Sequence, residues 1–186
     1  MRPQKLAKEE LLKHCALQFK TYGYAGTSMD MLAKACCLTK ASFYYYYPNK
    51  EALLLEVLNS THQYLIHSLF GNTVKSELSA IERFEQMHEC AVHFFTQGVN
   101  GCLIGIISME AAYGSPKILA KIRSIFEDWQ LAIQSIFAKC MTEDQAEILA
   151  KQSIADYEGA ILMYRVTHDE FYINQVKQRI LGLLSS

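Results

Sequence analysis

The stretch that decides the fold runs from residue 27 to residue 50 and reads TSMDMLAKACCLTKASFYYYYPNK. Its first hydroxyl residue, Thr27, stands three residues before Asp30, which is the spacing of a capping box at the start of a helix. We therefore expect a short helix here, with these side chains on its buried face: Met29, Leu32, Ala33 and Cys36. A turn through Cys37 and Leu38 should follow.

A second short helix is expected between Thr39, a good N-cap residue, and Pro48, which cannot continue a helix. It contains five consecutive aromatic residues, from Phe43 to Tyr47. A strand would expose half of these rings, whereas a helix can turn Phe43, Tyr46 and Tyr47 inward. Two short helices joined by a tight turn and followed by a longer helix predict a helix-turn-helix motif.

The second helix would turn its small and polar side chains outward: Lys40, Ala41, Ser42, Tyr44 and Tyr45. This set suits duplex DNA, because a cation and phenols can bind phosphate oxygens while small side chains allow close approach to the bases. Lys40 and Lys50 are expected to neutralise phosphates. The amide groups at the helix starts near Thr27, Thr39 and Asn49 should add partial positive charge.

The distribution of charge agrees with a DNA-binding front end. The 186 residues carry a formal net charge of −1, yet the first 50 hold eight basic and three acidic side chains, a net charge of +5. The rest of the chain must therefore carry −6. A basic segment attached to an acidic body is typical of a polyanion-binding module joined to a second domain.

The rest of the chain predicts helices throughout. Prolines occur only at positions 3, 48 and 116, and apolar residues recur at spacings of three and four in these ranges: 5–21, 49–69, 77–96, 117–140, 143–166 and 169–184. We expect an all-α fold of about nine helices, with a three-helix head at 1–49 and a helical ligand-binding and dimerisation body at 50–186. No apolar run is long enough for a membrane span, and no signal peptide is visible, so a cytoplasmic location is expected.

Four segments of the first 51 residues together resemble the DNA-binding domain of TetR-type transcriptional regulators. They are LLKHCALQF at 11–19, YGYAGTS at 22–28, MLAKA at 31–35 and LTKASFYYYYPNKE at 38–51. A weaker resemblance, to the regulatory domain of one TetR subgroup, lies in GCLIG at 101–105, MEAA at 109–112 and EGAIL at 158–162.

The resemblance implies a homodimeric repressor that binds a pseudo-palindromic double-stranded DNA operator through two recognition helices. It also implies a four-helix interface from the last two helices of each subunit, and release from DNA by a small-molecule inducer. By position, the DNA-contacting residues are Thr27, Lys40, Ala41, Ser42, Tyr44, Tyr45 and Lys50. The chain departs from the family pattern at Cys37, where glycine is usual, and at Tyr45, where histidine is frequent. If the backbone at Cys37 has a positive φ, a side chain there is strained.

The sequence predicts an inducer pocket between the helices at 77–96, 102–113 and 117–140. Its expected lining is Met87, Cys90, His93, Phe94, Met109, Tyr113, Phe126 and Trp129. Methionine and aromatic side chains favour a small, largely apolar or aromatic inducer, although ordinary core packing would also explain each of them. The last two helices, at 143–166 and 169–184, are expected to bind a second copy, because small residues such as Ala146, Ala150, Ser153 and Ala160 allow helices to approach closely.

Other functions have weaker sequence support. The six cysteines form no CxxC pair, but Cys36 and Cys37 adjoin in the turn, so a redox-responsive regulator is one alternative. Glu85, Glu89 and His93 offer only part of a metal site, and no metal or cofactor is expected. The chain lacks the common catalytic motifs, so no enzyme is expected. A helical adaptor that has lost DNA binding is the other alternative, which the outward polar residues of the second short helix oppose.

Overall fold

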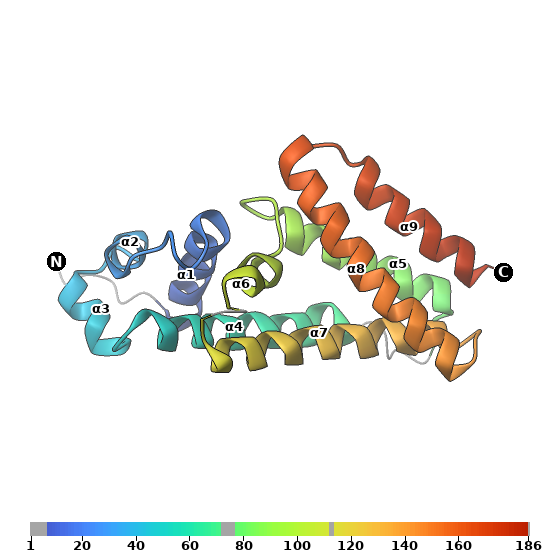
Figure 1. Cartoon of the computed structure of the whole chain (residues 1–186), viewed down its shortest axis with the longest axis horizontal. Coiled ribbons are helices and arrows are strands. Elements are labelled where there is room, and N and C mark those ends of the chain that lie inside the picture. Colours follow the sequence, from blue (N-terminus) through green and yellow to red (C-terminus); the bar gives the residue numbers. More distant parts are fainter. Residues whose placement is uncertain (1–6, 72–76, 112–113, 186) are drawn as a thin grey trace. The chain divides into compact units, whose positions relative to one another are not determined.

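The computed structural model describes residues 7–71, 77–111 and 114–185. These residues form nine α-helices and no strand, which confirms the all-α prediction (Figure 1). The helices are α1 (Lys8–Tyr22), α2 (Met29–Ala35), α3 (Lys40–Tyr46), α4 (Lys50–Ser68), α5 (Ala80–Thr96), α6 (Leu103–Ala111), α7 (Pro116–Phe137), α8 (Glu143–Thr167) and α9 (Phe171–Leu184).

The chain divides into two compact units. Unit 1 comprises Met1–His62 and Leu103–Ile122, and unit 2 comprises Gln63–Cys102 and Arg123–Ser186. α4 and α7 therefore each supply residues to both units, and α6 belongs with the N-terminal helices. The boundary expected between residues 49 and 50 separates a DNA-binding head from a ligand-binding body, and it stays a prediction.

In unit 1, α1 packs on α2 and α6, and α2 packs on α3. Ser28 caps α2, because its Oγ accepts a hydrogen bond from the Met31 amide at 3.2 Å, and Thr39 caps α3 in the same way through the Ser42 amide. The prediction that Thr27 caps α2 is wrong. Its hydroxyl donates instead to the Gly23 carbonyl at 2.6 Å. The cap therefore falls one residue later.

The turn between α2 and α3 is a Schellman motif. The amide of Cys37 donates to the Lys34 carbonyl at 3.0 Å, and the amide of Leu38 donates to the Ala33 carbonyl at 2.9 Å. Cys37 has φ +54°, in the left-handed region, so the condition under which a side chain is strained at this position is met. The turn thus keeps the geometry of a glycine turn with a cysteine in it.

The core of unit 2 is an aromatic cluster. The Trp129 ring lies 5.7 Å from those of Phe95 and Tyr157, centroid to centroid. The Tyr157 hydroxyl lies 2.7 Å from Nδ1 of His88, and both side chains are buried. The core of this unit thus contains a hydrogen-bonded polar pair among its aromatic rings.

α8 and α9 lie side by side in unit 2 (Figure 1). The small residues expected to face a second copy are buried within the single chain: Ala146, Ala150, Ser153 and Ala160. They allow close packing inside the subunit, so that part of the dimer argument is wrong. The large apolar side chains that α8 and α9 leave exposed are different ones: Ile148, Leu162, Met163, Val166 and Phe171.

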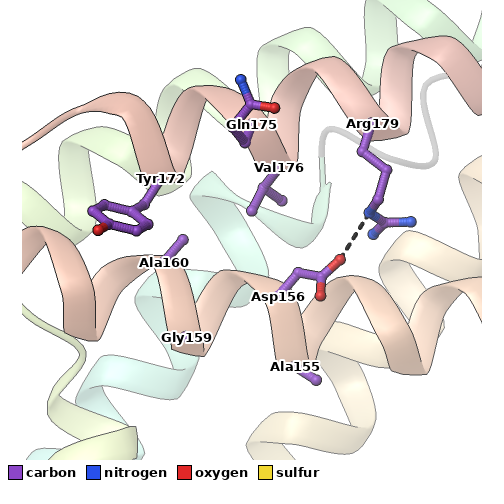
Figure 2. Close-up of a pocket in the computed structure, with 8 residues that line it drawn as sticks. All are labelled: Ala155, Asp156, Gly159, Ala160, Tyr172, Gln175, Val176 and Arg179. Carbon is purple, nitrogen blue, oxygen red and sulfur yellow. Dashed lines mark ion pairs between the residues drawn. The ribbon is translucent and has the colours of Figure 1, made fainter.

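A surface groove of about 520 Å³ runs between α8 and α9 (Figure 2). α8 supplies Ala155, Asp156, Gly159 and Ala160, and α9 supplies Tyr172, Gln175, Val176 and Arg179. Arg179 bridges the two helices, because its Nε lies 2.7 Å from the Asp156 carboxylate and its Nη2 donates to Ser153 Oγ at 2.9 Å. None of the residues expected to line an inducer pocket contributes to this groove.

Candidate nucleic-acid interface

α3 is anchored by two rings and exposes three. Phe43 is fully buried and Tyr47 is 7% exposed, whereas Tyr44, Tyr45 and Tyr46 are exposed to 43%, 86% and 49%. Tyr44 and Tyr45 therefore point outward as expected, but the expectation that Tyr46 faces inward is wrong. Phe43 and Tyr47 are one helical turn apart and fill the inner side, and Tyr46 packs its ring edge-on against Tyr45 at 5.5 Å.

Tyr47 fastens the end of α3 to α4. Its hydroxyl bonds Glu56, and burial together with this carboxylate raises the pKa of the Tyr47 phenol. Glu56 also pairs with Lys8 of α1. The end of α3 is thus linked to α4 directly and to α1 through Glu56, while the outer face of α3 stays exposed.

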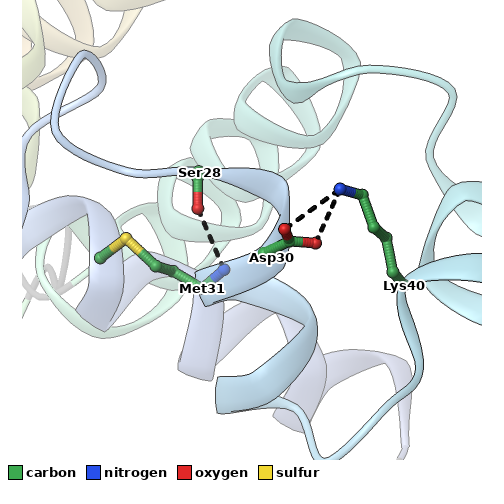
Figure 3. Close-up of polar contacts among 4 residues, drawn as sticks. All are labelled: Ser28, Asp30, Met31 and Lys40. Carbon is green, nitrogen blue, oxygen red and sulfur yellow. Dashed lines mark hydrogen bonds and ion pairs between the residues drawn. The ribbon is translucent and has the colours of Figure 1, made fainter.

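The outer face of α3 carries Lys40, Ala41 and Ser42, all exposed. Lys40 Nζ lies 3.0 and 3.1 Å from the two carboxylate oxygens of Asp30, in the first turn of α2 (Figure 3). The hydrogen bond to Asp30 is the main cause of the raised pKa of Lys40. Ser42 Oγ accepts a hydrogen bond from Thr39 Oγ1 at 2.8 Å. Lys40 and Ser42 therefore already have hydrogen-bond partners within the N-terminal helices.

Thr27 and Lys50 lie differently from the other predicted DNA contacts. Thr27 is 1% exposed, so its side chain has no surface with which to contact DNA. Lys50 Nζ donates to the carbonyls of Tyr24 at 2.6 Å and Thr27 at 2.8 Å, and it lies 4.2 Å from the centroid of the Tyr24 ring. Burial lowers the pKa of Lys50, with Glu110 opposing that shift. The structure gives Lys50 a bracing role, because two of its three N–H groups donate to backbone carbonyls of this loop.

The loop from residue 23 to residue 27 is also held by α6. The Ala25 amide donates to Glu110 Oε2 at 2.7 Å. Gly23 has φ +72°, and a Cβ there would collide with the Glu110 carboxylate. Lys50 and Glu110 therefore both hold the loop that leads into α2. The sequence predicts neither contact, because each joins residues that are far apart in the chain.

The residues expected to line an inducer pocket are scattered. Met87 and Trp129 are buried in the core of unit 2, and Cys90, Phe94 and Phe126 are partly buried there. His93 is exposed, on the side of α5 opposite its buried residues. Met109 is 78% exposed and belongs to unit 1, and Tyr113 lies outside the described residues. The structure therefore does not place His93 and Met109 in a buried lining.

The buried side-chain atoms of unit 2 that have no hydrogen-bond partner among the described residues include Trp129 Nε1 and Glu158 Oε1. Burial raises the pKa of Glu158, and a hydrogen bond with Cys102 opposes that shift. Cys102 and Glu158 lie in two segments that carried the weaker family resemblance, 101–105 and 158–162. The two segments thus meet in space, a pairing that their distance in the sequence conceals.

A helix-turn-helix whose second helix faces solvent, in a chain with a second helical unit, is typical of DNA-binding transcriptional regulators. Residues 11–57 match the family of bacterial regulatory proteins of the tetR type. Residues 80–179 match the C-terminal domain of LmrA/YxaF-like transcriptional regulators. The chain belongs to the TetR family of transcriptional regulators, as its sequence led us to expect.

Individual relatives agree with the family. The HTH-type transcriptional repressor DhaR of Mycobacterium sp. (strain GP1) is 25% identical over 178 residues, covering 90% of this chain and 87% of DhaR. YuxN of Bacillus subtilis (strain 168), an HTH-type transcriptional regulator, is 49% identical over 53 residues, covering 28% of this chain and 18% of YuxN. A TetR transcriptional regulator from Legionella pneumophila has the same fold, with a TM-score of 0.88, 22% identity, and coverage of 96% of this chain and 98% of that one.

The family consists of transcriptional regulators and not enzymes, which confirms the prediction that the chain is not an enzyme. Across residues 7–71, 77–111 and 114–185, no helix is both long and apolar enough to cross a membrane.

Proposed function

We propose that this regulator is a repressor that binds a pseudo-palindromic operator as a homodimer, with α3 of each copy in the major groove. The observation that carries this proposal is the division of α3 into an anchored face, Phe43 and Tyr47, and an open face. The residues proposed to contact DNA are Lys40, Ala41, Ser42, Tyr44 and Tyr45 from α3, with Thr39 and Lys50 contributing at helix starts. Thr27 leaves the set because its side chain is buried.

The dimer in this proposal forms through α8 and α9. Their exposed apolar side chains, Ile148, Leu162, Met163, Val166 and Phe171, would be covered by a second copy. A two-fold dimer places its recognition helices about one helical turn of DNA apart, roughly 34–36 Å, so the two half-sites should be related by symmetry. The protein would work in the cytoplasm, where the chromosome is.

The inducer in this proposal binds unit 2. Aromatic rings around Trp129 offer apolar contact, and Trp129 Nε1 and Glu158 Oε1 are polar atoms that a ligand could satisfy. The indole N–H would bind a hydrogen-bond acceptor and the carboxyl group a donor. Such a ligand releases the operator only if it binds the non-DNA-binding arrangement more tightly than the DNA-binding one.

The experiment that tests the proposal is selection of duplexes from a random library by the purified protein at low salt. We expect an enriched sequence with two inverted half-sites, bound by two copies of the chain. A panel of apolar and aromatic compounds should then include some that weaken this binding. Failure to enrich any duplex would overturn the proposal, and enrichment by a monomer at a single half-site would overturn its dimeric part.

Redox control is a second candidate function, because one thiol pair lies in the core of the DNA-binding head. Cys15 Sγ and Cys36 Sγ are 3.7 Å apart, joining α1 to the end of α2, and both side chains are buried. The hydrogen bond between them lowers the pKa of Cys36 and, with burial, raises that of Cys15. Hydrogen peroxide would convert Cys36 to a sulfenic acid, and the Cys15 thiol would then displace water to form a disulfide.

A disulfide here would draw the end of α2 toward α1 and shift the turn that leads into α3. We expect peroxide to lower operator affinity, with a Cys15–Cys36 cross-link found by peptide mapping and affinity restored by a dithiol reductant. Cys36→Ala should abolish this response, whereas Cys140→Ala, which removes an exposed thiol, should keep it. A response that persists in Cys36→Ala would contradict the role of this pair.

A further inference from the structure

The contact between Asp30 and Lys40 joins the two helices of the DNA-reading motif on its exposed side. Lys40 is the first residue of α3 and Asp30 lies in the first turn of α2. Both carboxylate oxygens lie within 3.1 Å of Lys40 Nζ, while the two side chains are 52% and 58% exposed (Figure 3). Solvent reaches the pair, so a DNA phosphate could reach it as well.

Folding stability does not account for this pair. Exposed lysine–carboxylate pairs contribute little to stability, because the side chains lose freedom and water screens the charges. α2 and α3 are already joined by the turn and packed on each other, and their side chains Leu32, Ala33 and Phe43 are buried. The consequence of the pair therefore lies at the surface that meets DNA.

Asp30 is the only acidic residue between Ser28 and Tyr47, the segment that forms the motif. Its negative charge repels any phosphate that approaches. Asp30 also pairs with Lys40, the cation at the start of α3. Lysine contributes to non-specific binding mainly as a point charge on phosphate, whereas sequence is read at base edges. An acidic residue paired with such a lysine therefore weakens its contacts with phosphates more than its contacts with base edges.

We propose that Asp30 is a positioning residue that sets sequence selectivity by withholding Lys40 from phosphates of unrelated DNA. On a wrong duplex the ammonium stays on Asp30, and the carboxylate repels the backbone. On the operator, the remaining contacts of α3 bring Lys40 close to a base-edge acceptor such as guanine O6 or N7, and its three N–H groups can serve both the base and Asp30. The inference rests on the proposed placement of α3 in the major groove.

The test compares wild type with Asp30→Asn on the selected operator and on a shuffled duplex of equal length, over a series of KCl concentrations. We expect the variant to bind the shuffled duplex five- to tenfold more tightly and the operator less than twofold more tightly. The salt slope for the shuffled duplex should steepen by about 0.9, as one more phosphate is neutralised. Asp30→Glu, which keeps the charge, should restore most of the selectivity.

Two controls separate positioning from net charge. Glu9→Gln removes another exposed acid that pairs with a lysine of the same head, Lys13 at 2.8 Å, and it should leave selectivity unchanged. Lys40→Gln should diminish the effect of Asp30→Asn when the two are combined, because Asp30 acts mainly through Lys40. If Asp30→Asn fails to fold, Asp30→Ser carries the same comparison.

Three results would overturn the inference: equal effects of Glu9→Gln and Asp30→Asn, an unchanged operator-to-shuffled ratio in Asp30→Asn, or an undiminished effect of Asp30→Asn in the Lys40→Gln background. Failure of the proposed function is distinguishable, since the wild-type protein would then select no duplex at all.

Discussion

Cys37 carries backbone strain in the turn of the DNA-reading motif. Its φ of +54° lies in the left-handed region, where the Cβ of an L-residue crowds the following carbonyl. Glycine avoids this crowding and is the usual residue at this position of a Schellman motif. The hydrogen bonds of Cys37 and Leu38 hold the strained conformation in place.

Cys37→Gly should therefore stabilise unit 1. We expect its free energy of unfolding to rise by about 1 kcal/mol, since relief of the left-handed strain exceeds the added flexibility of the unfolded chain. Urea denaturation followed by circular dichroism measures this change. Cys140→Gly, at an exposed cysteine with no positive φ, is the control and should not stabilise. A Cys37→Gly variant less stable than wild type would contradict the account of the turn.

His88 makes the stability of unit 2 depend on pH. Burial, with a smaller effect from Lys177, lowers the pKa of His88 from 6.5 to about 4. Between these values the unfolded chain binds a proton that the folded chain does not bind, so the free energy of unfolding should fall as pH drops from 6.5 to 4. The contribution is fully present above pH 6.5.

Thermal melts between pH 7 and pH 4 test this prediction. His88→Gln should flatten the fall in Tm over this range, at about 2–4 °C for each kcal/mol that the histidine contributes. His93→Gln removes an exposed histidine of the same helix and should leave the pH profile as in wild type. If both variants keep the wild-type pH profile, the buried imidazole is not the cause.

At the scale of elements, Lys50 braces the loop that leads into α2. Two carbonyls, those of Tyr24 and Thr27, accept its N–H groups, and Glu110 of α6 holds the same loop at the Ala25 amide. The start of α4 and the end of α6 thus both help to fix the position of α2. Because α3 packs on α2, they also influence the position of α3. A change at either helix can reach the DNA-reading surface along these contacts.

Lys50→Met should destabilise unit 1 by about 1–3 kcal/mol, because two carbonyls lose their donor. We expect operator affinity to fall by more than the loss of one phosphate contact explains, since displacement of α2 adds to the loss of the DNA contact proposed for Lys50. Lys13→Met is the charge-matched control on α1. A salt slope reduced by about one unit, with wild-type stability, would instead make Lys50 a plain phosphate contact.

Helical periodicity was a sound guide to the elements but not to their contacts. The predicted ranges end within a few residues of the observed helices, because apolar spacing and the turns around Gly23, Pro48 and Pro116 are local signals. Tyr46 and Thr27 were misplaced because packing against other helices decided between neighbouring positions. The pairings of Cys15 with Cys36, and of Glu158 with Cys102, join distant segments, so no local pattern reveals them.

At the scale of the whole molecule, the two compact units correspond to two tasks in this account. Unit 1 contains the DNA-reading motif, and unit 2 contains the aromatic core, the buried carboxyl of Glu158 and the apolar surface of α8 and α9. α4 and α7 supply residues to both units.

The central claim is that the open face of α3 reads DNA, and Tyr44→Ala tests it most directly. The measurement is affinity for the selected operator and for its single-base variants, with Tyr22→Ala as a control that removes another exposed tyrosine, from α1. We predict that Tyr44→Ala weakens operator binding at least tenfold and loses discrimination at symmetry-related positions of both half-sites, while Tyr22→Ala binds as wild type does. Equal behaviour of the two variants, with the operator still bound and discriminated, would contradict the claim.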